Sequence, residues 1–139
     1  MALAALLVGV AAGALAVRAL KGWRRGEDAS VAIRSLDQRL LDEAMTLVET
    51  TCDPDQDAAL VLAADGWHAR VVGIVASRIV ERFGRPAFLI ALEGEVGKGS
   101  GRSISRFDLH AALHHCGDLL DRFGGHHMAA GLTLRRDQL

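Results

Sequence analysis

Residues 30–50 carry the spacing of an amphipathic helix. Hydrophobic side chains recur there at steps of three and four residues, while charged residues such as Arg34, Arg39 and Glu43 fill the other side. Pro54 follows soon after, and the residue before a proline is pushed out of helical conformation. The pattern predicts one long helix over residues 30–50 and a domain boundary just after it.

Beyond Asp57 the pattern changes to short apolar runs. Residues 58–63 and 87–92 are each continuously hydrophobic, as in strands that are buried on both faces. Residues 71–83 between them have one apolar face, and Gly84 and Pro86 mark the end of this helix. The strand–helix–strand order predicts an α/β domain.

The last third of the chain is predicted from local signals. The glycine-rich residues 96–104 are expected to form an irregular strand or a loop. Asp108 is placed to cap a helix over residues 109–123, and Gly124 stands where a left-handed residue would end it. Residues 131–134 complete the prediction as a final strand. The expected fold is α/β, with a buried sheet flanked by helices and preceded by a long helix.

The N-terminal segment needs a separate interpretation. Residues 1–17 contain no charged side chain, and four basic residues follow within the next eight positions. One alternative is a membrane-anchoring helix with a basic flank. The run is at the short limit of about 17–25 residues for a membrane span, and it is rich in alanine and glycine. The favoured alternative is a helix separated from its packing partner by truncation.

Composition limits the kinds of ligand site. The formal net charge of the 139 residues is −1, so any anion-binding site must be built locally. The two cysteines, Cys52 and Cys116, lie far apart, which excludes a disulfide framework or a zinc knuckle and favours free thiols in a reducing cytoplasm. The chain has no tyrosine, which argues against a base-stacking RNA module.

A first candidate site is Gly66-Trp67-His68, just before the helix over residues 71–83. Free amides at a helix N-terminus attract phosphate. Trp67 offers a ring for stacking and His68 a hydrogen-bond donor. The alternative is a core tryptophan beside a half-buried histidine, and the tripeptide taken alone favours this alternative.

A second candidate is the run from Gly97 to Ser103, in which three glycines alternate with polar residues. Lys98, Arg102 and Arg106 have no acidic residue between them. Glycine lets backbone amides approach a ligand, and an arginine fork can hold a phosphate through two hydrogen bonds. The run lacks the Gly-Lys-Ser/Thr ending of a Walker A loop. A flexible surface loop is the alternative.

A third candidate is Gly124-Gly125-His126, where small residues follow on the C-terminal side. The alternative is a plain helix C-cap and tight turn, which the segment taken alone favours. His110 and His114 form a further pair that could contact a metal ion, since residues four apart share a helix face. No third ligand is evident, so a solvated histidine-rich face is the favoured interpretation of that pair.

Together these segments resemble the RecJ family of single-stranded-DNA exonucleases. The runs GWHARVVGIVASRIVE at 66–81, GKGSGRSI at 97–104 and GGHHMAAG at 124–131 follow the family's order and approximate spacing. The resemblance covers roughly residues 30–139. It divides the chain into an apolar segment 1–28, a connector helix 29–54, and a C-terminally truncated, DHH-associated nucleic-acid-binding domain 55–139.

The resemblance also implies a division of labour. In this family a preceding DHH domain holds two divalent metal ions, Mn²⁺ or Mg²⁺, and the associated domain grips the DNA strand. No Asp-His-His motif occurs here, so neither catalytic nor metal-binding residues are expected in this chain. The expected substrate-binding residues are Trp67, His68, Lys98, Ser100, Gly101, Arg102, Ser103, Gly124, Gly125 and His126.

The expected function is the substrate-gripping part of a 5′–3′ single-stranded-DNA exonuclease in DNA repair and recombination. Its partners would be single-stranded DNA and the catalytic DHH domain, in the cytoplasm. The chain alone is expected to be inactive. Two alternatives remain: a non-catalytic single-strand binding module, and a related DHH phosphoesterase acting on short oligonucleotides or cyclic dinucleotides.

Overall fold

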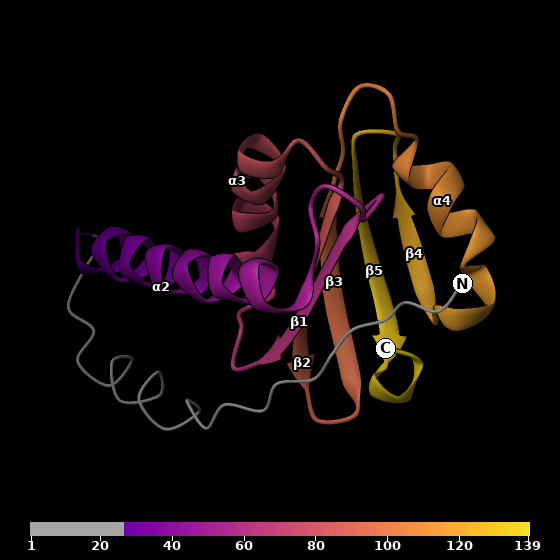
Figure 1. The fold of residues 1–139 in the computed structure, drawn as a ribbon. Helices are drawn as coiled ribbons and strands as arrows, with labels where there is room; N and C mark the ends of the chain where they lie inside the picture. The colour runs from indigo at the N-terminus through magenta and orange to yellow at the C-terminus, as the bar shows by residue number, and fades with distance from the viewer. Residues whose placement is uncertain (1–26) are drawn as a thin grey trace.

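The computed structural model describes residues 27–139, and residues 1–17 lie outside that range. The described helices are α2 (Glu27–Thr51), α3 (Val72–Phe83) and α4 (Leu109–His115), and the strands are β1 (Leu60–Asp65), β2 (Ala87–Glu93), β3 (Val96–Arg102), β4 (Arg122–Gly125) and β5 (Ala129–Arg135). The strands form one sheet in the order β1-β2-β3-β5-β4 (Figure 1). The predicted α/β fold, with a sheet flanked by helices and a long helix before it, is confirmed.

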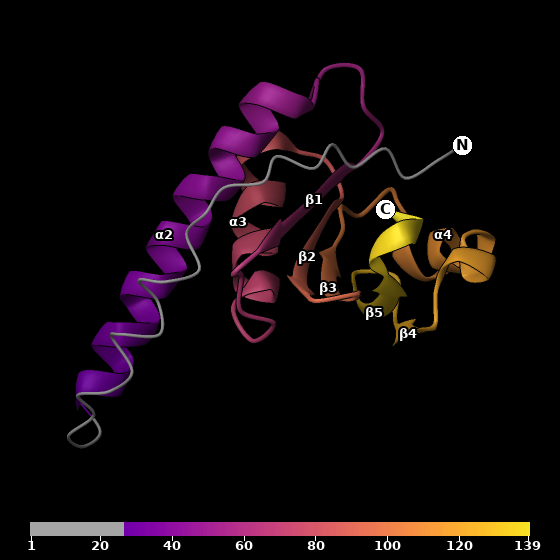
Figure 2. The same ribbon diagram turned by 90° about the horizontal axis from the view of Figure 1, so that it is seen from below.

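Two hydrophobic cores lie on opposite faces of this sheet. One contains residues of α2 and α3 with alternate residues of β1 and β2, among them Leu60, Leu62 and Leu89. The other contains the intervening residues of β2, such as Ile90, together with α4 and β5. Figure 2 shows α2 and α3 on one side of the sheet and α4 on the other. Strand β2 is buried on both faces, which explains its continuously apolar sequence.

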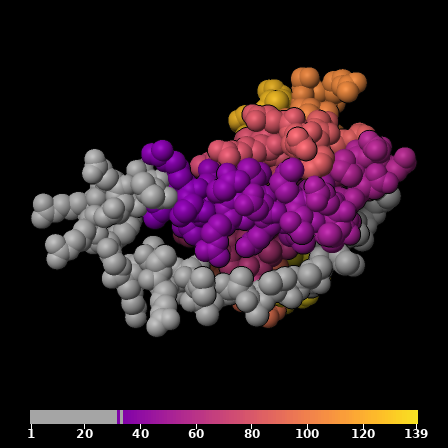
Figure 3. Space-filling view, turned by 60° about the vertical axis from the view of Figure 1, so that its left-hand side comes forward, coloured from indigo at the N-terminus to yellow at the C-terminus, as the bar shows by residue number. Residues whose placement is uncertain are grey.

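The long helix α2 lies on the outside of α3, as the space-filling view shows (Figure 3). Its apolar residues Leu40, Ala44 and Val48 are buried at four-residue intervals, so one face of the helix joins the first core. Asp37 is also buried and lies 3.8 Å from the guanidinium of Arg78 on α3. The helix is therefore an integral part of the domain's packing.

The glycine-rich run 96–104 contains a regular strand, β3, in the middle of the sheet. It pairs antiparallel with β2 on one side and with β5 on the other. Gly97, Gly99 and Gly101 point into the second core, where a methyl group on Gly101 would lie 2.5 Å from the ring of Phe88. These glycines therefore leave room for the packed side chains opposite them.

The prediction of one helix over residues 109–123 is wrong. Asp108 caps the helix as expected, accepting from the Ala111 amide at 2.9 Å, but α4 ends at His115. Residues Arg122–Gly125 form edge strand β4, so Gly124 is a strand residue without positive φ. Phe123 packs against the second core from this strand. Its apolar side chain therefore stands where the sequence pattern placed the last core residue of a helix.

Several local predictions are confirmed. Gly84 ends α3 in the left-handed conformation, with φ of 65°. Both cysteines are free and half-buried, and burial raises the pKa of the Cys52 thiol. The membrane-anchoring alternative concerned residues 1–17, which lie outside the described residues. Among the helices that are described, none is long and apolar enough to cross a membrane.

Replacing Gly101 with alanine should destabilise the fold because the added methyl group collides with Phe88 and Leu109. Overpacking of this kind costs about 1–3 kcal/mol. Urea unfolding measures the change. Gly124→Ala is the matched control, since a methyl group there meets no atom within 4 Å. Equal stability of the two variants would contradict the packing role given to the β3 glycines.

Candidate nucleic-acid interface

The face of β3 opposite its glycines carries polar side chains in ordered rows. Residues that are directly opposite in an antiparallel pair point to the same face. The pairing registers therefore define three cross-strand rows on this face: Lys98–Thr133–Arg122, then Ser100–Gly131–Gly124, then Arg102–Ala129. We call this surface the basic face. It places side chains of β3, β5 and β4 side by side although they are distant in the sequence.

Helix α3 lies along one side of the basic face. A methyl group on Gly73 of α3 would lie 2.9 Å from Nη2 of Arg102 and 3.0 Å from Oγ of Ser100. Glycine at this position therefore allows the first turn of α3 to approach both side chains. That first turn contains no acidic residue, and no side chain caps the helix. The positive end of the helix dipole thus reinforces the charge of Arg102.

The Arg102 side chain is held by hydrogen bonds of its own strand. Its Nη1 donates to Oγ of Ser100 at 2.9 Å and to the carbonyl of Gly101 at 2.8 Å. No acidic partner of Arg102 is found within residues 27–139. The guanidinium is therefore positioned in advance while its charge stays available to an anion.

The hairpin between β4 and β5 lies at the same end of the sheet as Arg102. Arg102 pairs with Ala129, and the Ser103 amide donates to the Met128 carbonyl at 3.0 Å. His126 is exposed in this hairpin, and its Nδ1 accepts from the Met128 amide at 3.3 Å. In the neutral ring this bond leaves the proton on Nε2. Arg102 and His126 therefore lie at the same end of the sheet, with strand β5 between them.

A depression on the basic face is floored by bare backbone. Its lining residues are Lys98, Gly99, Arg122, Phe123, Gly124, Gly131, Leu132 and Thr133. Gly124 and Gly131 are exposed and form a cross-strand pair. A methyl group on Gly124 would contact nothing within 4 Å, so the fold itself does not require glycine there. The depression can receive a flat ligand directly against the peptide groups.

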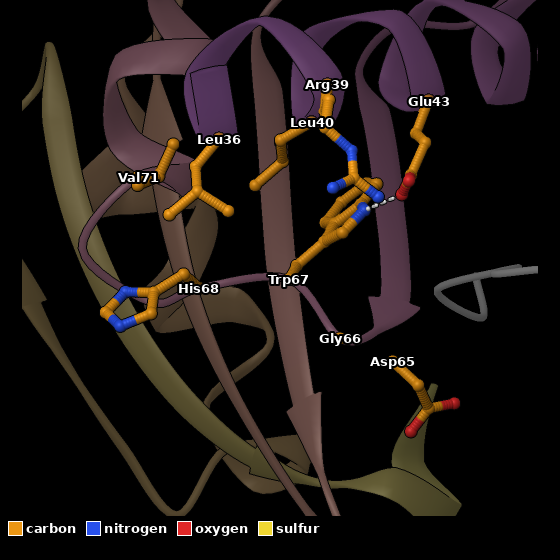
Figure 4. A pocket seen from close by; sticks show the side chains of 9 residues that line it. All are labelled: Leu36, Arg39, Leu40, Glu43, Asp65, Gly66, Trp67, His68 and Val71. Atoms are coloured by element: carbon orange, nitrogen blue, oxygen red, sulfur yellow. Dashed lines mark hydrogen bonds between the residues drawn. The ribbon is translucent and has the colours of Figure 1, made fainter. Parts of the chain in front are cut away.

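Two expected binding residues have internal roles instead. Trp67 is only 8% exposed and donates its indole N–H to Oε2 of Glu43 at 2.9 Å (Figure 4). Its ring therefore belongs to the contact between α2 and the domain, as in the core-tryptophan alternative, and little of it is exposed for stacking. Ser103 is buried, and its hydroxyl donates to the Phe107 carbonyl at 2.6 Å. It fixes the turn after β3 and has no free hydroxyl for a phosphate.

Some of the remaining expected residues lie on the basic face, and the others lie elsewhere in the domain. Lys98, Ser100 and Arg102 share the basic face with Gly124, whereas Gly101 points into the second core. Gly125 adopts φ of 141° at the hairpin. His68 is exposed near the start of α3, in the separate pocket of Figure 4 that Trp67 also lines. The pairing registers therefore place four of the ten expected residues on the basic face: Lys98, Ser100, Arg102 and Gly124.

Sequence reasoning missed Arg122 and Thr133. Arg122 was assigned to a helix, and only its pairing with Thr133 places it beside Lys98 on the basic face. The sequence contained a signal for this position, because Arg122 stands two residues before Gly124. Residues two apart on a strand point to the same face.

The described residues provide no metal centre. No group of three or more His, Cys, Asp or Glu side chains within residues 27–139 is placed to hold a metal ion. The His110 and His114 rings stack edge to face, with centroids 4.6 Å apart, and His114 packs in the same way on Phe123 at 5.0 Å. These rings are thus engaged with one another and with the β4 strand.

A mixed five-stranded sheet with helices packed on both faces defines a small α/β domain. The chain belongs to the DHHA1 domain family, whose model matches residues 56–139. Its DHHA1 domain is of the RecJ type.

Curated relatives carry the name single-stranded-DNA-specific exonuclease RecJ. The protein of Bacillus subtilis is 48% identical over 103 residues, which is 73% of this chain and 13% of the relative. That of Escherichia coli is 41% identical over 113 residues, 76% of this chain and 19% of the relative. The chain therefore spans less than a fifth of the length of these relatives.

Solved structures give the same relationship. RecJ of Thermus thermophilus in complex with Mg²⁺ superposes with a TM-score of 0.64 at 36% identity, covering 77% of this chain and 16% of that one. An exonuclease RecJ bound to manganese gives 0.65 at 37% identity, covering 77% and 25%. The C-Ala domain of Aquifex aeolicus alanyl-tRNA synthetase, at 11% identity and a TM-score of 0.52, shares the fold alone.

Replacing Glu43 with alanine should leave the buried indole N–H of Trp67 without its acceptor. An unpaired buried donor costs about 1–3 kcal/mol of unfolding free energy. Urea unfolding of Glu43→Ala, compared with Glu43→Gln, measures this cost, because glutamine retains a carbonyl acceptor. Glu49→Ala, an exposed position on the same helix, should change little. A loss as large in Glu49→Ala would show that helix propensity, not the hydrogen bond, is responsible.

Proposed function

We propose that this chain is the substrate-gripping part of a RecJ-type 5′–3′ single-stranded-DNA exonuclease, acting in DNA repair and recombination in the cytoplasm. The observation that carries the proposal is the basic face. It combines a pre-positioned Arg102–Ser100 pair, the N-terminal turn of α3 and a depression floored by Gly124 and Gly131. Phosphate contacts from such groups give affinity without reading base sequence.

Each residue of the proposed grip has a physical role. Arg102 and Ser100 hold a terminal or backbone phosphate, since a guanidinium and a hydroxyl can donate to its oxygens together. Lys98 adds a mobile cation farther along β3. Nε2 of His126 supplies a donor at the edge of the sheet. The exposed glycines let the strand approach the backbone.

The proposal also assigns the parts of the chain. Residues 29–54 are the connector helix and residues 55–139 the DHHA1 domain that faces a DHH catalytic domain. The hydrogen bond between Trp67 and Glu43 supports this division, since it fixes the connector on the domain that grips the strand. The divalent ions named in the RecJ structures would be held by the DHH domain, and they would supply an activated water for phosphodiester hydrolysis.

Arg102→Ala should weaken binding of a 5′-phosphorylated oligothymidylate by about tenfold because one phosphate contact is lost. The dependence of affinity on salt should become shallower by about one counterion. Fluorescence anisotropy across a salt series measures both quantities. Arg82→Ala removes an equal charge from the exposed last turn of α3 and is the matched control. Unchanged affinity in Arg102→Ala would refute the grip.

The chain by itself should not hydrolyse DNA, because the described residues hold no metal cluster that could activate water. The assay follows release of nucleotides from end-labelled single-stranded DNA in the presence of Mn²⁺. A parallel reaction with a chelator identifies background cleavage. Robust manganese-dependent release by the pure chain would contradict the division between a gripping and a catalytic domain.

A further inference from the structure

The row of the basic face farthest from Arg102 contains two cations with a hydroxyl between them. Lys98 on β3 and Arg122 on β4 both pair with Thr133 on the intervening strand β5. All three side chains therefore rise from the same face of the sheet. Lys98 and Arg122 are exposed, and they line one depression.

We propose that Lys98, Thr133 and Arg122 form a second phosphate subsite, separate from the Arg102–Ser100 pair and engaged by the same strand. This inference rests on the proposed function and deepens it, since two subsites define the path of the bound DNA along β3 and β5. The ligand it requires is an extended oligonucleotide, not a single nucleotide.

The spacing across the sheet suits a phosphate held from two sides. Neighbouring strands lie about 4.8 Å apart, so the backbones of Lys98 and Arg122 are about 10 Å apart. Both side chains are long enough to converge above Thr133, whose hydroxyl can donate to the same anion. Such convergence without a ligand would bring two cations together, so a bound anion stabilises the arrangement.

The charges around this row define its limits. Neither Lys98 nor Arg122 forms an ion pair in the part of the chain that the structure describes. Arg135, which pairs with Val96 in the next row outward, is instead bound to Asp137 at 3.1 Å. The hydrogen bond to Asp137 and the charge of that residue raise the pKa of Arg135, and the charges of Asp121 and Glu95 add to this effect. The acidic cluster around Arg135 therefore closes the basic face beyond the Lys98 row.

The spacing along the sheet separates the two subsites. Arg102 and Lys98 are four residues apart on β3, or about 13 Å. The row between them consists of Ser100 and the exposed pair Gly131 and Gly124. One nucleotide is shorter than this separation, so only a chain of several nucleotides reaches both subsites. Its sugars and bases would lie over the bare glycines.

The test compares ligand length against the two subsites. Thymidine 5′-monophosphate and 5′-phosphorylated oligothymidylates from two to about eight nucleotides are titrated into the full chain and its Arg122→Ala variant. Arg122→Ala should weaken binding of the longer oligonucleotides by about tenfold and leave the monophosphate unaffected. Arg122→Lys should restore most of the affinity, because a phosphate contact through charge does not need the fork. Arg82→Ala is again the matched control.

The outcomes separate this inference from the proposed function. Arg102→Ala should weaken binding of every ligand, including the monophosphate. If Arg102→Ala does so while Arg122→Ala changes nothing, or weakens all lengths equally, the second subsite is wrong and the grip stands. If neither variant changes binding, or if the unaltered chain binds no oligonucleotide, both proposals fail.

Discussion

Strand β3 lies in the middle of the sheet and has space for side chains on one face only. On the other face Ile90, Leu132 and Phe88 occupy the positions where methyl groups would project from its glycines. The strand alternates with period two, so excluding side chains from one face directs every polar residue to the other. Lys98, Ser100 and Arg102 gather on the basic face for this reason. The arrangement of the candidate site therefore follows from the packing of the second core.

The basic face remains open because α3 covers only part of the sheet. Helix α3 contacts β2 and β3, while β5 and β4 lie beyond it on the same face. Helix α2 packs outside α3 and is tied to the domain through Trp67 and Glu43. Burial of this indole stabilises the packing of α2 but removes an aromatic ring from the surface. The binding that we propose for the basic face would therefore depend on charge and exposed backbone, with little contribution from stacking.

Features governed by near neighbours were predictable from the sequence. The helices α2 and α3, the strands β1 and β2, and the Asp108 cap follow from spacing within a few residues, although β1 is an edge strand in which only alternate residues are buried. Strand β4 was not predictable in this way, because Phe123 and Leu120 are spaced as on a helix yet reach the core from a strand and a turn. Only pairing with β5 distinguishes the two cases, and such pairing is non-local.

The candidate site shows the same division. The segments containing Arg102 and His126 were identified from glycine and basic residues, and the structure places both segments at the same end of the sheet. The burial of Trp67 and Ser103, and the place of Arg122 opposite Thr133, depend on packing and register. A one-residue change in register would move every side chain of a strand to the opposite face.

The central claim is that a nucleic-acid strand lies on the basic face. The most direct measurement is an amide NMR titration of the ¹⁵N-labelled chain with a 5′-phosphorylated oligothymidylate. We expect the largest chemical-shift changes at the amides of Gly99, Arg102, Gly124, Gly131 and Thr133. Changes concentrated instead on the histidine-bearing face of α4, or around the pocket beside Trp67, would contradict it.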